Sequence, residues 1–331
     1  MNLPTHMRAM TIEHAALQLA TLPLPAVADD EVLLRVAYAG INRADLLQVE
    51  GSYAPPTGAS PLPGLEVSGT VAALGKNVSG WAIGQKTCAL LSGGGYAEYV
   101  AVPATQLLPI PDNISLQDAA SLPESLATSV MALVQVAHLQ PGERVLVHGG
   151  TSGLGIYMVQ VAKALGAEVF ATVGSDEKLA FLKNFGVQGI NHRASPFADQ
   201  IMQATNGEGV DMIIDTLGAP QLATHLKLLR KGGRMVTLAM LEGNVVESVK
   251  IAGFFLKQLS WSGATLRGRT LSQKAEIITT IRQQLWPHLL SGRIKPVVDS
   301  VFPLKDAENA LKKMQERLHM GKILLEARAS S

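Results

Sequence analysis

The most constraining feature of this sequence is a regular alternation of strand-like and helix-like segments between residues 119 and 261. Apolar runs such as RVLVHG, EVFATV and VDMIIDTLG are each followed by a stretch of helical length, and Gly stands at the helix ends. This order predicts right-handed βαβ units. A parallel sheet covered by helices on both faces also explains why the strand segments are continuously apolar. We therefore predict an α/β fold with a doubly wound parallel sheet here.

The two flanking regions have a different character. Residues 1–118 contain short β-like runs separated by dense Gly and Pro, which is typical of a small, mainly antiparallel β-domain. Residues 262–331 contain two helix-like stretches and two short strand-like ones, and we expect this region to return to the first domain. The predicted organisation is a mainly β domain made of residues 1–118 and 262–331, with the doubly wound domain at 119–261 between them.

Composition and charge restrict the partners of this chain. Its 331 residues are 47% hydrophobic and 17% charged, which is typical of a globular protein with room for two domains. The net charge of +1, with no block of like charges, argues against nucleic acid or a membrane surface as a partner. The first ten residues lack the apolar core of a signal peptide, and no window approaches the roughly 18 apolar residues of a membrane span. We expect a cytoplasmic protein with a small-molecule ligand.

A glycine-rich loop stands in HGGTSGLGIYMVQVAKALG, residues 148–166. It lacks the strict G-x-G-x-x-G pattern, but it follows the strand RVLVH and opens a helix, where unpaired backbone N–H groups and the helix dipole favour a phosphate. A tight turn that only packs helix on sheet is the alternative. The residues predicted to bind a dinucleotide here are Gly150, Thr151, Ser152, Gly153, Leu154 and Gly155.

The end of the next strand decides which dinucleotide is favoured. Gly174 and Ser175 follow EVFATV, where NAD-binding folds usually carry an acid for the ribose 2′-hydroxyl. Asp176 and Glu177 are instead explained as first-turn acids of a helix capped by Ser175. Lys178 opposes the helix dipole in that turn, which suggests a function. We predict a 2′-phosphate site at Gly174, Ser175 and Lys178, and hence NADPH; a solvated helix lysine is the alternative.

Motifs along nearly the whole chain carry a family resemblance. They are GINRADLLQVEGSY, PLPGLEVSGTVAALG, GGGYAEYVAVP, LPESLATSVMAL and GTSGLGIYMVQVAKALGAEV. They resemble the zinc-independent quinone oxidoreductases, the zeta-crystallin-like branch of the medium-chain dehydrogenase/reductase superfamily, and with the terminal GKILLE they are most similar to the tumour-suppressor-inducible subgroup. The resemblance implies a GroES-like catalytic domain made of both ends of the chain, a Rossmann domain between them, NADPH as reductant and quinones as acceptors.

The zinc ligands of the related alcohol dehydrogenases are replaced in this chain. Their positions fall at Asn42, at Leu65 and near Pro123. A catalytic zinc needs about three nitrogen or sulfur donors. Cys88 is the single cysteine, and no two of the eight histidines are spaced four residues apart. We therefore predict no metal, and we expect Cys88 to be a packed strand residue rather than a reactive thiol.

Without a Lewis acid, the acceptor must already be electrophilic, as quinones and activated enones are. The resemblance implies that Asn42 is a donor near the nicotinamide and the substrate oxygen. It implies that Tyr53 is a donor or a stacking partner for a planar acceptor. Ser152 either binds the cofactor or faces the quinone. The alternatives are that Asn42 satisfies its own turn and that Tyr53 covers a Pro-rich loop.

Further residues are expected around the cofactor. Thr128 matches a threonine near the nicotinamide ribose or carboxamide in relatives, although a Thr bonded within its own helix is the alternative. Gly218, Ala239 and Met240 follow strands, beyond whose carboxyl ends ligands of open sheets bind. His192 replaces a tyrosine used near the adenosine phosphate. In the family, the segments that contain Leu266, Arg267 and Lys322 here reach back to the cofactor, so these three residues are also candidates. The alternative is that Arg267 and Lys322 are ordinary surface cations.

The sequence as a whole predicts an NADPH-dependent, metal-free quinone reductase. An NADPH-dependent 2-alkenal or enoyl reductase is the closest alternative, and a non-catalytic nucleotide-binding sensor or crystallin-like protein is the alternative from another class. The apolar strands RMVTLAM and LSWSGATL come late in the doubly wound domain and would leave a sheet edge that needs covering. Pairing across a two-fold axis covers such an edge, so we predict a homodimer.

Overall fold

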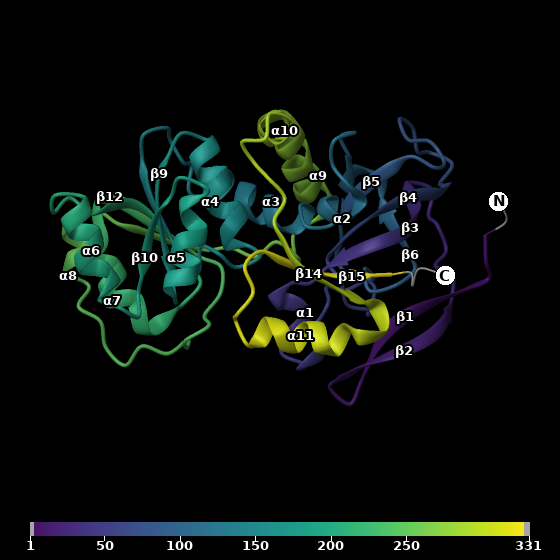
Figure 1. Ribbon diagram of the computed structural model, residues 1–331, viewed down its shortest axis with the longest axis horizontal. Helices are drawn as coiled ribbons and strands as arrows, with labels where there is room; N and C mark the ends of the chain where they lie inside the picture. Colours follow the sequence, from purple (N-terminus) through teal and green to yellow (C-terminus); the bar gives the residue numbers. More distant parts are fainter. Residues whose placement is uncertain (1–2, 328–331) are drawn as a thin grey trace. The chain divides into compact units, whose positions relative to one another are not determined.

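The computed structural model describes residues 3–327, which divide into two compact units (Figure 1). The first unit comprises Met1–Ala127, Leu266–Ser291 and Lys295–Ser331, and the second comprises Thr128–Thr265 and Gly292–Ile294. The first unit thus extends beyond residue 118, where the sequence analysis places the boundary. One reason is that the segment after 118 is bonded to the first unit's sheet, since the Glu124 N–H donates to Glu66 Oε2 at 2.9 Å.

The second unit is built on a six-stranded parallel sheet. Its strands are β8 (Arg144–Val147), β9 (Glu168–Val173), β10 (Gln188–Asn191), β11 (Val210–Asp215), β12 (Leu229–Thr237) and β13 (Ser260–Gly263). Their order in space is β10-β9-β8-β11-β12-β13, and each neighbouring pair is parallel. The chain reverses its direction of travel across the sheet between β8 and β11, which is the switch point where doubly wound sheets bind nucleotides. The predicted Rossmann sheet is confirmed.

Helices connect these strands. They are α4 (Gly155–Ala164), α5 (Asp176–Lys183), α6 (Phe197–Ala204), α7 (Leu222–Leu228) and α8 (Ala252–Leu256), with the π-helical η2 (Val130–Val136) and the 3₁₀ turn η3 (Ala219–Gln221). Helix α4 is buried from Gly155 to Ala162, which explains its apolar sequence. A core of side chains including Leu146, Phe170 and Ile213 joins strands β8, β9 and β11. This core fixes the strand ends that carry the loops.

The first unit contains a largely antiparallel sheet. Its strands are β3 (Glu31–Gly40), β4 (Glu66–Leu74), β5 (Lys86–Leu90), β6 (Tyr99–Pro103), β7 (Leu107–Pro109), β14 (Val298–Pro303) and β15 (Lys322–Glu326), beside the hairpin of β1 (His6–Glu13) and β2 (Ala16–Pro23). The sheet order is β14-β15-β3-β4-β5-β7, with β6 also paired to β3. Strand β15, from the end of the chain, pairs antiparallel with β3. Cys88 is fully buried within β5, as expected of a packed strand residue.

Short helices complete the first unit. They are α1 (Arg43–Val49), α2 (Leu116–Ala119), α3 (Pro123–Ser129), α9 (Leu271–Thr280), α10 (Trp286–Leu290) and α11 (Ala307–Gln315), with η1 (Ala104–Gln106), η4 (Ile281–Leu285) and η5 (Leu304–Asp306). The last two residues of α3 belong to the second unit. Helix α1 begins where the Asn42 backbone N–H donates to Asp45 Oδ2 at 2.8 Å. Within residues 3–327, no helix is long and apolar enough to cross a membrane.

Candidate active site

The glycine-rich loop connects β8 to α4 at the switch point of the second unit's sheet. Gly149 has a φ of +67°, and the Ser152 N–H donates to its carbonyl oxygen at 2.9 Å. The Ser152 Oγ accepts from the Gly155 N–H at 3.0 Å. A Cβ on Gly155 would collide with the Gly149 carbonyl, and a Cβ on Gly150 would lie 2.6 Å from the Ala171 Cβ. Gly150 is therefore pressed against β9 and Gly155 against the start of the loop, so that neither position has room for a side chain.

This arrangement fits the pyrophosphate of a dinucleotide. The predicted residues 150–155 lie together between the carboxyl end of β8 and the first turn of α4. The backbone N–H groups at a helix N-terminus favour a phosphate. Because glycines leave the backbone bare, a ligand can approach it closely. The Ser152 hydroxyl is already an acceptor inside the loop, so its direct role toward cofactor or acceptor stays a prediction.

Basic side chains gather at the carboxyl end of β9. The Ser175 Oγ accepts from the Lys178 backbone N–H at 3.3 Å, which makes Ser175 the N-cap of α5. His192 Nε2 and Arg193 Nε lie 3.5 and 3.4 Å from the point that a Cβ on Gly174 would occupy. Burial and the neighbouring Arg193 lower the pKa of His192. The structure thus places His192 beside Gly174, and the predicted role of both residues at the cofactor phosphate stays a prediction. It also places Arg193 there, which the sequence analysis missed although a cation two residues after the third strand could have indicated it.

The other predicted cofactor residues of the second unit also lie at strand ends. Gly218, with a φ of +92°, follows β11, and a Cβ on it would lie 2.9 Å from the Met240 Cα. The Gly218 N–H donates to Asp215 Oδ1 at 3.2 Å, which holds this turn. Ala239 and Met240 are the second and third residues after β12, and about half of the Met240 surface is exposed. Thr128 is buried near the end of α3.

A buried pair of imidazoles supports the start of the loop. His148 Nε2 lies 2.8 Å from His225 Nε2, and His148 Nδ1 lies 3.0 Å from Thr172 Oγ1, which also accepts from the Gly149 N–H at 3.3 Å. Burial lowers the pKa of both imidazoles, so both rings are neutral and one donates its Nε2 proton to the other. The sequence analysis missed this pair because the two residues are far apart in the chain.

The first unit contains a buried polar cluster that includes two predicted site residues. Lys322 Nζ donates to Asn42 Oδ1 at 2.6 Å and forms an ion pair with Glu66. Asn42 Nδ2 in turn donates to Glu66 Oε1 at 3.0 Å. Glu66 and Lys322 are 0% and 1% exposed. A Cβ on Gly40 would collide with the Glu66 carboxylate, so the end of β3 leaves space for this acid.

These contacts define what the Asn42 and Lys322 side chains do in this structure. The Asn42 amide oxygen accepts from Lys322, and its nitrogen donates to Glu66 and, at 3.4 Å, to the Gly40 carbonyl. Asn42 therefore orients two buried charges. Its predicted role as a donor to the substrate oxygen stays a prediction. The alternative that Arg267 and Lys322 are ordinary surface cations is wrong, because they are only 4% and 1% exposed.

Asp45 extends the cluster below the start of α1. Its Oδ2 accepts from the Asn42 N–H at 2.8 Å and from the Tyr96 hydroxyl at 2.9 Å, and its Oδ1 accepts from the Gly64 N–H at 3.0 Å. Burial raises the pKa of Asp45 to about 6, although these donors and Lys322 oppose the shift. The carboxyl group is therefore mostly ionised at neutral pH, and its oxygens are held by donors.

A second group of buried cations consists of Arg267, which lies against the Tyr53 ring, and Lys274, which is bonded to the Arg267 backbone. The Arg267 Cζ lies 5.6 Å from the centre of the Tyr53 ring, and its Nη2 donates to Gln48 Oε1 at 2.7 Å. Lys274 Nζ donates to Ser92 Oγ at 2.6 Å and to the Arg267 carbonyl at 2.8 Å. Burial raises the pKa of the half-buried Tyr53 phenol. A guanidinium against the ring stabilises one orientation of this tyrosine.

The positions that hold the zinc ligands in related dehydrogenases carry no set of metal-binding side chains in this chain. Asn42 has both ends of its amide engaged, and Leu65 is a buried aliphatic residue. Within residues 3–327, no three His, Cys, Asp or Glu side chains are grouped so as to hold a metal ion. The residues present therefore do not fit the zinc site of those enzymes.

The fold and the dinucleotide loop define an oxidoreductase that uses a pyridine nucleotide, and comparisons with known proteins identify its family. Residues 28–112 match the alcohol dehydrogenase GroES-like domain, and residues 153–281 match the family described as zinc-binding dehydrogenase. The human synaptic vesicle membrane protein VAT-1 homolog is 30% identical over 319 residues, covering 91% of this chain and 80% of that protein. The chain belongs to the medium-chain dehydrogenase/reductase superfamily, in its quinone-oxidoreductase-like branch, as the sequence predicts.

Other relatives include an enoyl reductase and a quinone oxidoreductase. A phenolphthiocerol/phthiocerol polyketide synthase protein of Mycobacterium tuberculosis is 33% identical over 297 residues, and the matched part is 89% of this chain but only 13% of that protein. The CurK enoyl reductase superposes with a TM-score of 0.85, 28% identity and coverage of 98% of this chain and 99% of that one. The quinone oxidoreductase of Pseudomonas syringae pv. tomato DC3000 superposes with a TM-score of 0.83, 26% identity and coverage of 97% and 99%.

Replacing Lys322 by Met is expected to lower the free energy of unfolding by about 3 to 5 kcal/mol, because Glu66 would stay buried without its cation. The double variant Lys322→Met with Glu66→Leu is expected to lose less, since both charges are removed. The control is Lys313→Met, which breaks the partly exposed Lys313–Asp299 pair and is expected to cost about 1 kcal/mol or less. Urea unfolding measures all three; equal losses for Lys322→Met and Lys313→Met would contradict the expectation.

Proposed function

We propose that this protein is an NADPH-dependent quinone oxidoreductase that works without a metal ion. The observation that carries the proposal is Tyr53, a half-buried aromatic ring held by the guanidinium of Arg267 beside a second buried cation, Lys274. Such a ring offers a planar acceptor a stacking face and a phenolic donor. The similarity to a quinone oxidoreductase over nearly the whole chain supports the same acceptor class.

The choice of NADPH rests on the carboxyl end of β9. No carboxylate follows the strand directly, and Ser175, Lys178, His192 and Arg193 lie in the two segments that meet at Gly174. A 2′-phosphate is a strong acceptor for cationic donors, and an arginine near this strand end is the usual means of accommodating it. When bound, NADPH supplies the hydride that reduces the acceptor.

The residues of the first unit supply the electrostatic part of the reaction. As negative charge grows on an acceptor oxygen, the Tyr53 hydroxyl donates a hydrogen bond to it. Buried positive charge on Arg267 and Lys274 stabilises the same charge, because preorganised donors act strongly where water is excluded. In this proposal Asn42 orients Lys322 and Glu66. No step requires a Lewis acid, since a quinone is already electrophilic.

An NADPH-dependent 2-alkenal or enoyl reductase is the second candidate function. The likeness to the CurK enoyl reductase and to a polyketide synthase favours it specifically. Both reactions would use the same dinucleotide loop and the same buried cations, so the acceptor alone distinguishes them.

Purified protein is expected to oxidise NADPH steadily with 1,4-benzoquinone or 9,10-phenanthrenequinone and more slowly with trans-2-alkenals. Tyr53→Phe is expected to lower kcat/KM for the quinone about tenfold or more, because one donor to the developing charge is lost. Tyr38→Phe, on β3, is the matched control and is expected to leave the rate unchanged. A preference for alkenals would favour the second candidate. Tight NADPH binding without turnover of any acceptor would favour a nucleotide-binding sensor.

The variants Lys178→Ala and Arg193→Ala are each expected to raise the KM for NADPH by about tenfold and to leave the KM for NADH unchanged, since each removes a charge-assisted contact to the 2′-phosphate. Lys183→Ala, an exposed lysine at the other end of α5, serves as the control. Initial rates with both cofactors measure the effect. Equal use of NADH and NADPH by the parent protein would rule out the phosphate site.

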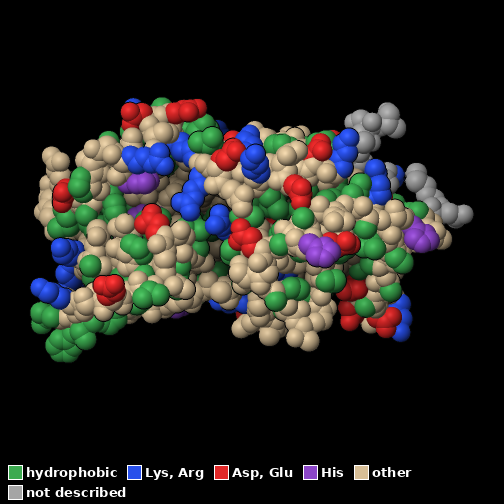
Figure 2. Space-filling view, turned by 90° about the horizontal axis from the view of Figure 1, so that it is seen from below, with side chains coloured by type: hydrophobic (Ala, Val, Ile, Leu, Met, Phe, Trp, Pro, Cys, Tyr) green, Lys and Arg blue, Asp and Glu red, His purple; other side chains and the backbone are tan. Residues whose placement is uncertain are grey.

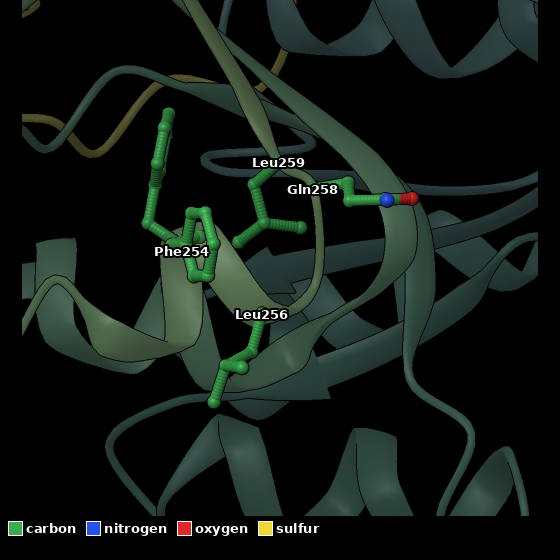
Figure 3. Close-up of a pocket in the computed structure, with 5 residues that line it drawn as sticks. Phe254, Leu256, Gln258 and Leu259 are labelled. Atoms are coloured by element: carbon green, nitrogen blue, oxygen red, sulfur yellow. The ribbon is translucent and has the colours of Figure 1, made fainter.

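We also propose that the protein is a homodimer that pairs through the β13 end of the second unit. Strand β13 is the last strand of its sheet, so one edge of its backbone is open. Phe255 and Leu256 of α8 are 79% and 70% exposed, and Figure 2 shows hydrophobic side chains at the surface of this end of the unit. In Figure 3, Phe254 packs against Leu259 beside the exposed Leu256. An apolar hollow next to an open strand edge suits a second copy of the chain.

Phe255→Glu is therefore expected to convert a dimer into a monomer at micromolar concentration, because it places a charge in the apolar contact. Light scattering coupled to gel filtration measures the mass. Leu318→Glu is the control, since Leu318 is 71% exposed but belongs to the first unit. A parent protein that is monomeric, or a Phe255→Glu protein that remains dimeric, would overturn this interface.

A further inference from the structure

A chain of buried hydrogen bonds joins the start of the glycine-rich loop to β9 and α7. Thr172 Oγ1, in β9, accepts from the Gly149 N–H at 3.3 Å and lies 3.0 Å from His148 Nδ1. On the other side of that ring, His148 Nε2 lies 2.8 Å from Nε2 of His225, in α7. Thr172, His148 and His225 are 3%, 2% and 0% exposed. Their polar groups therefore depend on one another for partners.

The positions of the protons in this chain follow from the acceptors within reach. The Thr172 hydroxyl group has one such acceptor within residues 3–327, which is His148 Nδ1. If His148 carried its proton on Nδ1, this buried hydroxyl group would have no acceptor, and buried donors are nearly always paired. The hydroxyl group therefore donates to His148 Nδ1. Since both rings are neutral, His148 carries its proton on Nε2 and donates it to His225, whose own proton is then on Nδ1.

The direction of the chain affects how the loop is held. A hydroxyl group that donates its own proton is a stronger acceptor, because successive hydrogen bonds polarise one another. The donor to the Thr172 hydroxyl oxygen is the Gly149 N–H. The Thr172 carbonyl oxygen also accepts from the Gly150 N–H at 2.9 Å. One residue of β9 therefore binds two consecutive N–H groups of the loop, and the imidazole pair orients its hydroxyl group for the first of them.

The peptide at Gly149 in turn positions the rest of the loop. Its carbonyl oxygen accepts from the Ser152 N–H at 2.9 Å, so the residue is bonded on both sides. Within residues 3–327, the backbone N–H groups of Thr151 and Leu154 donate to no protein acceptor, which leaves them available to a phosphate. The direction in which these two groups point depends on the anchored peptide at Gly149.

The imidazole pair also connects two segments at the switch point of the sheet. His148 follows β8, and His225 lies in α7, the helix that follows β11 and the Gly218 turn. Phe197 packs edge-on against His148, with 5.2 Å between the ring centres and 84° between the ring planes. The packing limits rotation of the His148 ring. The bond between the imidazoles thus holds the start of the glycine-rich loop against a helix on the other side of the switch point.

We propose that Thr172, His148 and His225 are positioning residues for the coenzyme, because their hydrogen-bond chain holds the glycine-rich loop in the conformation that binds the pyrophosphate. The inference rests on the coenzyme of the proposed function and is independent of the acceptor. NADPH and NADH share the pyrophosphate, so the chain acts equally on both. This distinguishes it from the predicted 2′-phosphate site, which acts on NADPH alone.

The first experiment measures the dissociation constants of NADPH and NADH by nicotinamide fluorescence, with no acceptor present. Thr172→Val keeps the shape of the side chain but removes the hydroxyl group, and it is expected to raise both constants by about tenfold. Thr172→Ser is expected to restore most of the affinity. His225→Leu is expected to weaken both coenzymes, and His225→Gln, whose amide oxygen can accept from His148 Nε2, is expected to restore part of the loss.

The matched control is Thr205→Val. Thr205 is a buried threonine of the same unit, 1% exposed, whose hydroxyl oxygen also accepts from a glycine N–H, that of Gly209 at 3.0 Å. It stands between α6 and the start of β11, away from the strand ends that carry the loop. Both Val variants are expected to melt at a lower temperature, but only Thr172→Val is expected to change the dissociation constants. A Thr172→Val protein that binds both coenzymes as tightly as the parent would overturn the inference.

The second experiment needs no coenzyme. Nitrogen NMR of protein with isotope-labelled histidine distinguishes the protonated nitrogen of a neutral ring from the unprotonated one, and the loss of signals in His148→Phe and His225→Leu assigns the two rings. The expected protons are on Nε2 of His148 and on Nδ1 of His225. The reverse arrangement would contradict the proposed chain.

Failure of this inference is separable from failure of the proposed function. A parent protein that binds NADPH but reduces no quinone overturns the proposed acceptor, and the dissociation constants of the variants still support or overturn the chain. A parent that binds neither NADPH nor NADH overturns the proposed function and this inference together.

Discussion

The buried ion pair between Lys322 and Glu66 is the contact on which the first unit depends. Lys322 begins β15, Glu66 begins β4, and Asn42 at the start of α1 bonds to both. Removing two charges from water costs several kcal/mol each, and only close, well-satisfied contacts offset that cost. The contacts of this ion pair form only if β15 pairs with β3 in the observed register. They also require a glycine at position 40, because a Cβ there would collide with the Glu66 carboxylate. The pair therefore links the register of the sheet to the position of the site residues.

The same cluster determines the electrostatics of the site. One ion pair alone would leave the surroundings neutral, but Asp45 and Glu124 interact electrostatically with it, and Glu124 in turn interacts with Lys274 and Arg267. In a medium that screens charge poorly, each added carboxylate makes the next one harder to ionise. The rise in the pKa of Asp45 is limited, because hydrogen-bond donors bind its carboxylate oxygens. Burial, together with the nearby Glu66, raises the pKa of the Glu124 carboxyl group to about 8.

The sequence predicts those features that depend on neighbours along the chain. The alternation of apolar strands and helices predicted the Rossmann sheet, and Ser175 was expected to cap its helix. The motifs also led to Tyr53, Arg267 and Lys322 as site candidates, but not to their burial or their partners. Arg193, His225, Lys274 and Glu124 were missed, because each acquires its role from residues brought to it by the fold. Glu124 stands in the quoted LPES segment, yet no local pattern shows that Glu66 and Lys322 will face it.

The two units differ in the kind of chemical group that they present to a ligand. The second unit presents backbone groups and glycines at strand ends, and this geometry recognises phosphates whatever the reaction. The first unit presents a particular set of buried charges, and in the proposed function those charges stabilise the oxygen anion that forms on the acceptor. Relatives with one scaffold and different substrates are consistent with this division. In the proposed function, acceptor specificity therefore depends on the residues around Tyr53, and cofactor specificity depends on those around Gly174.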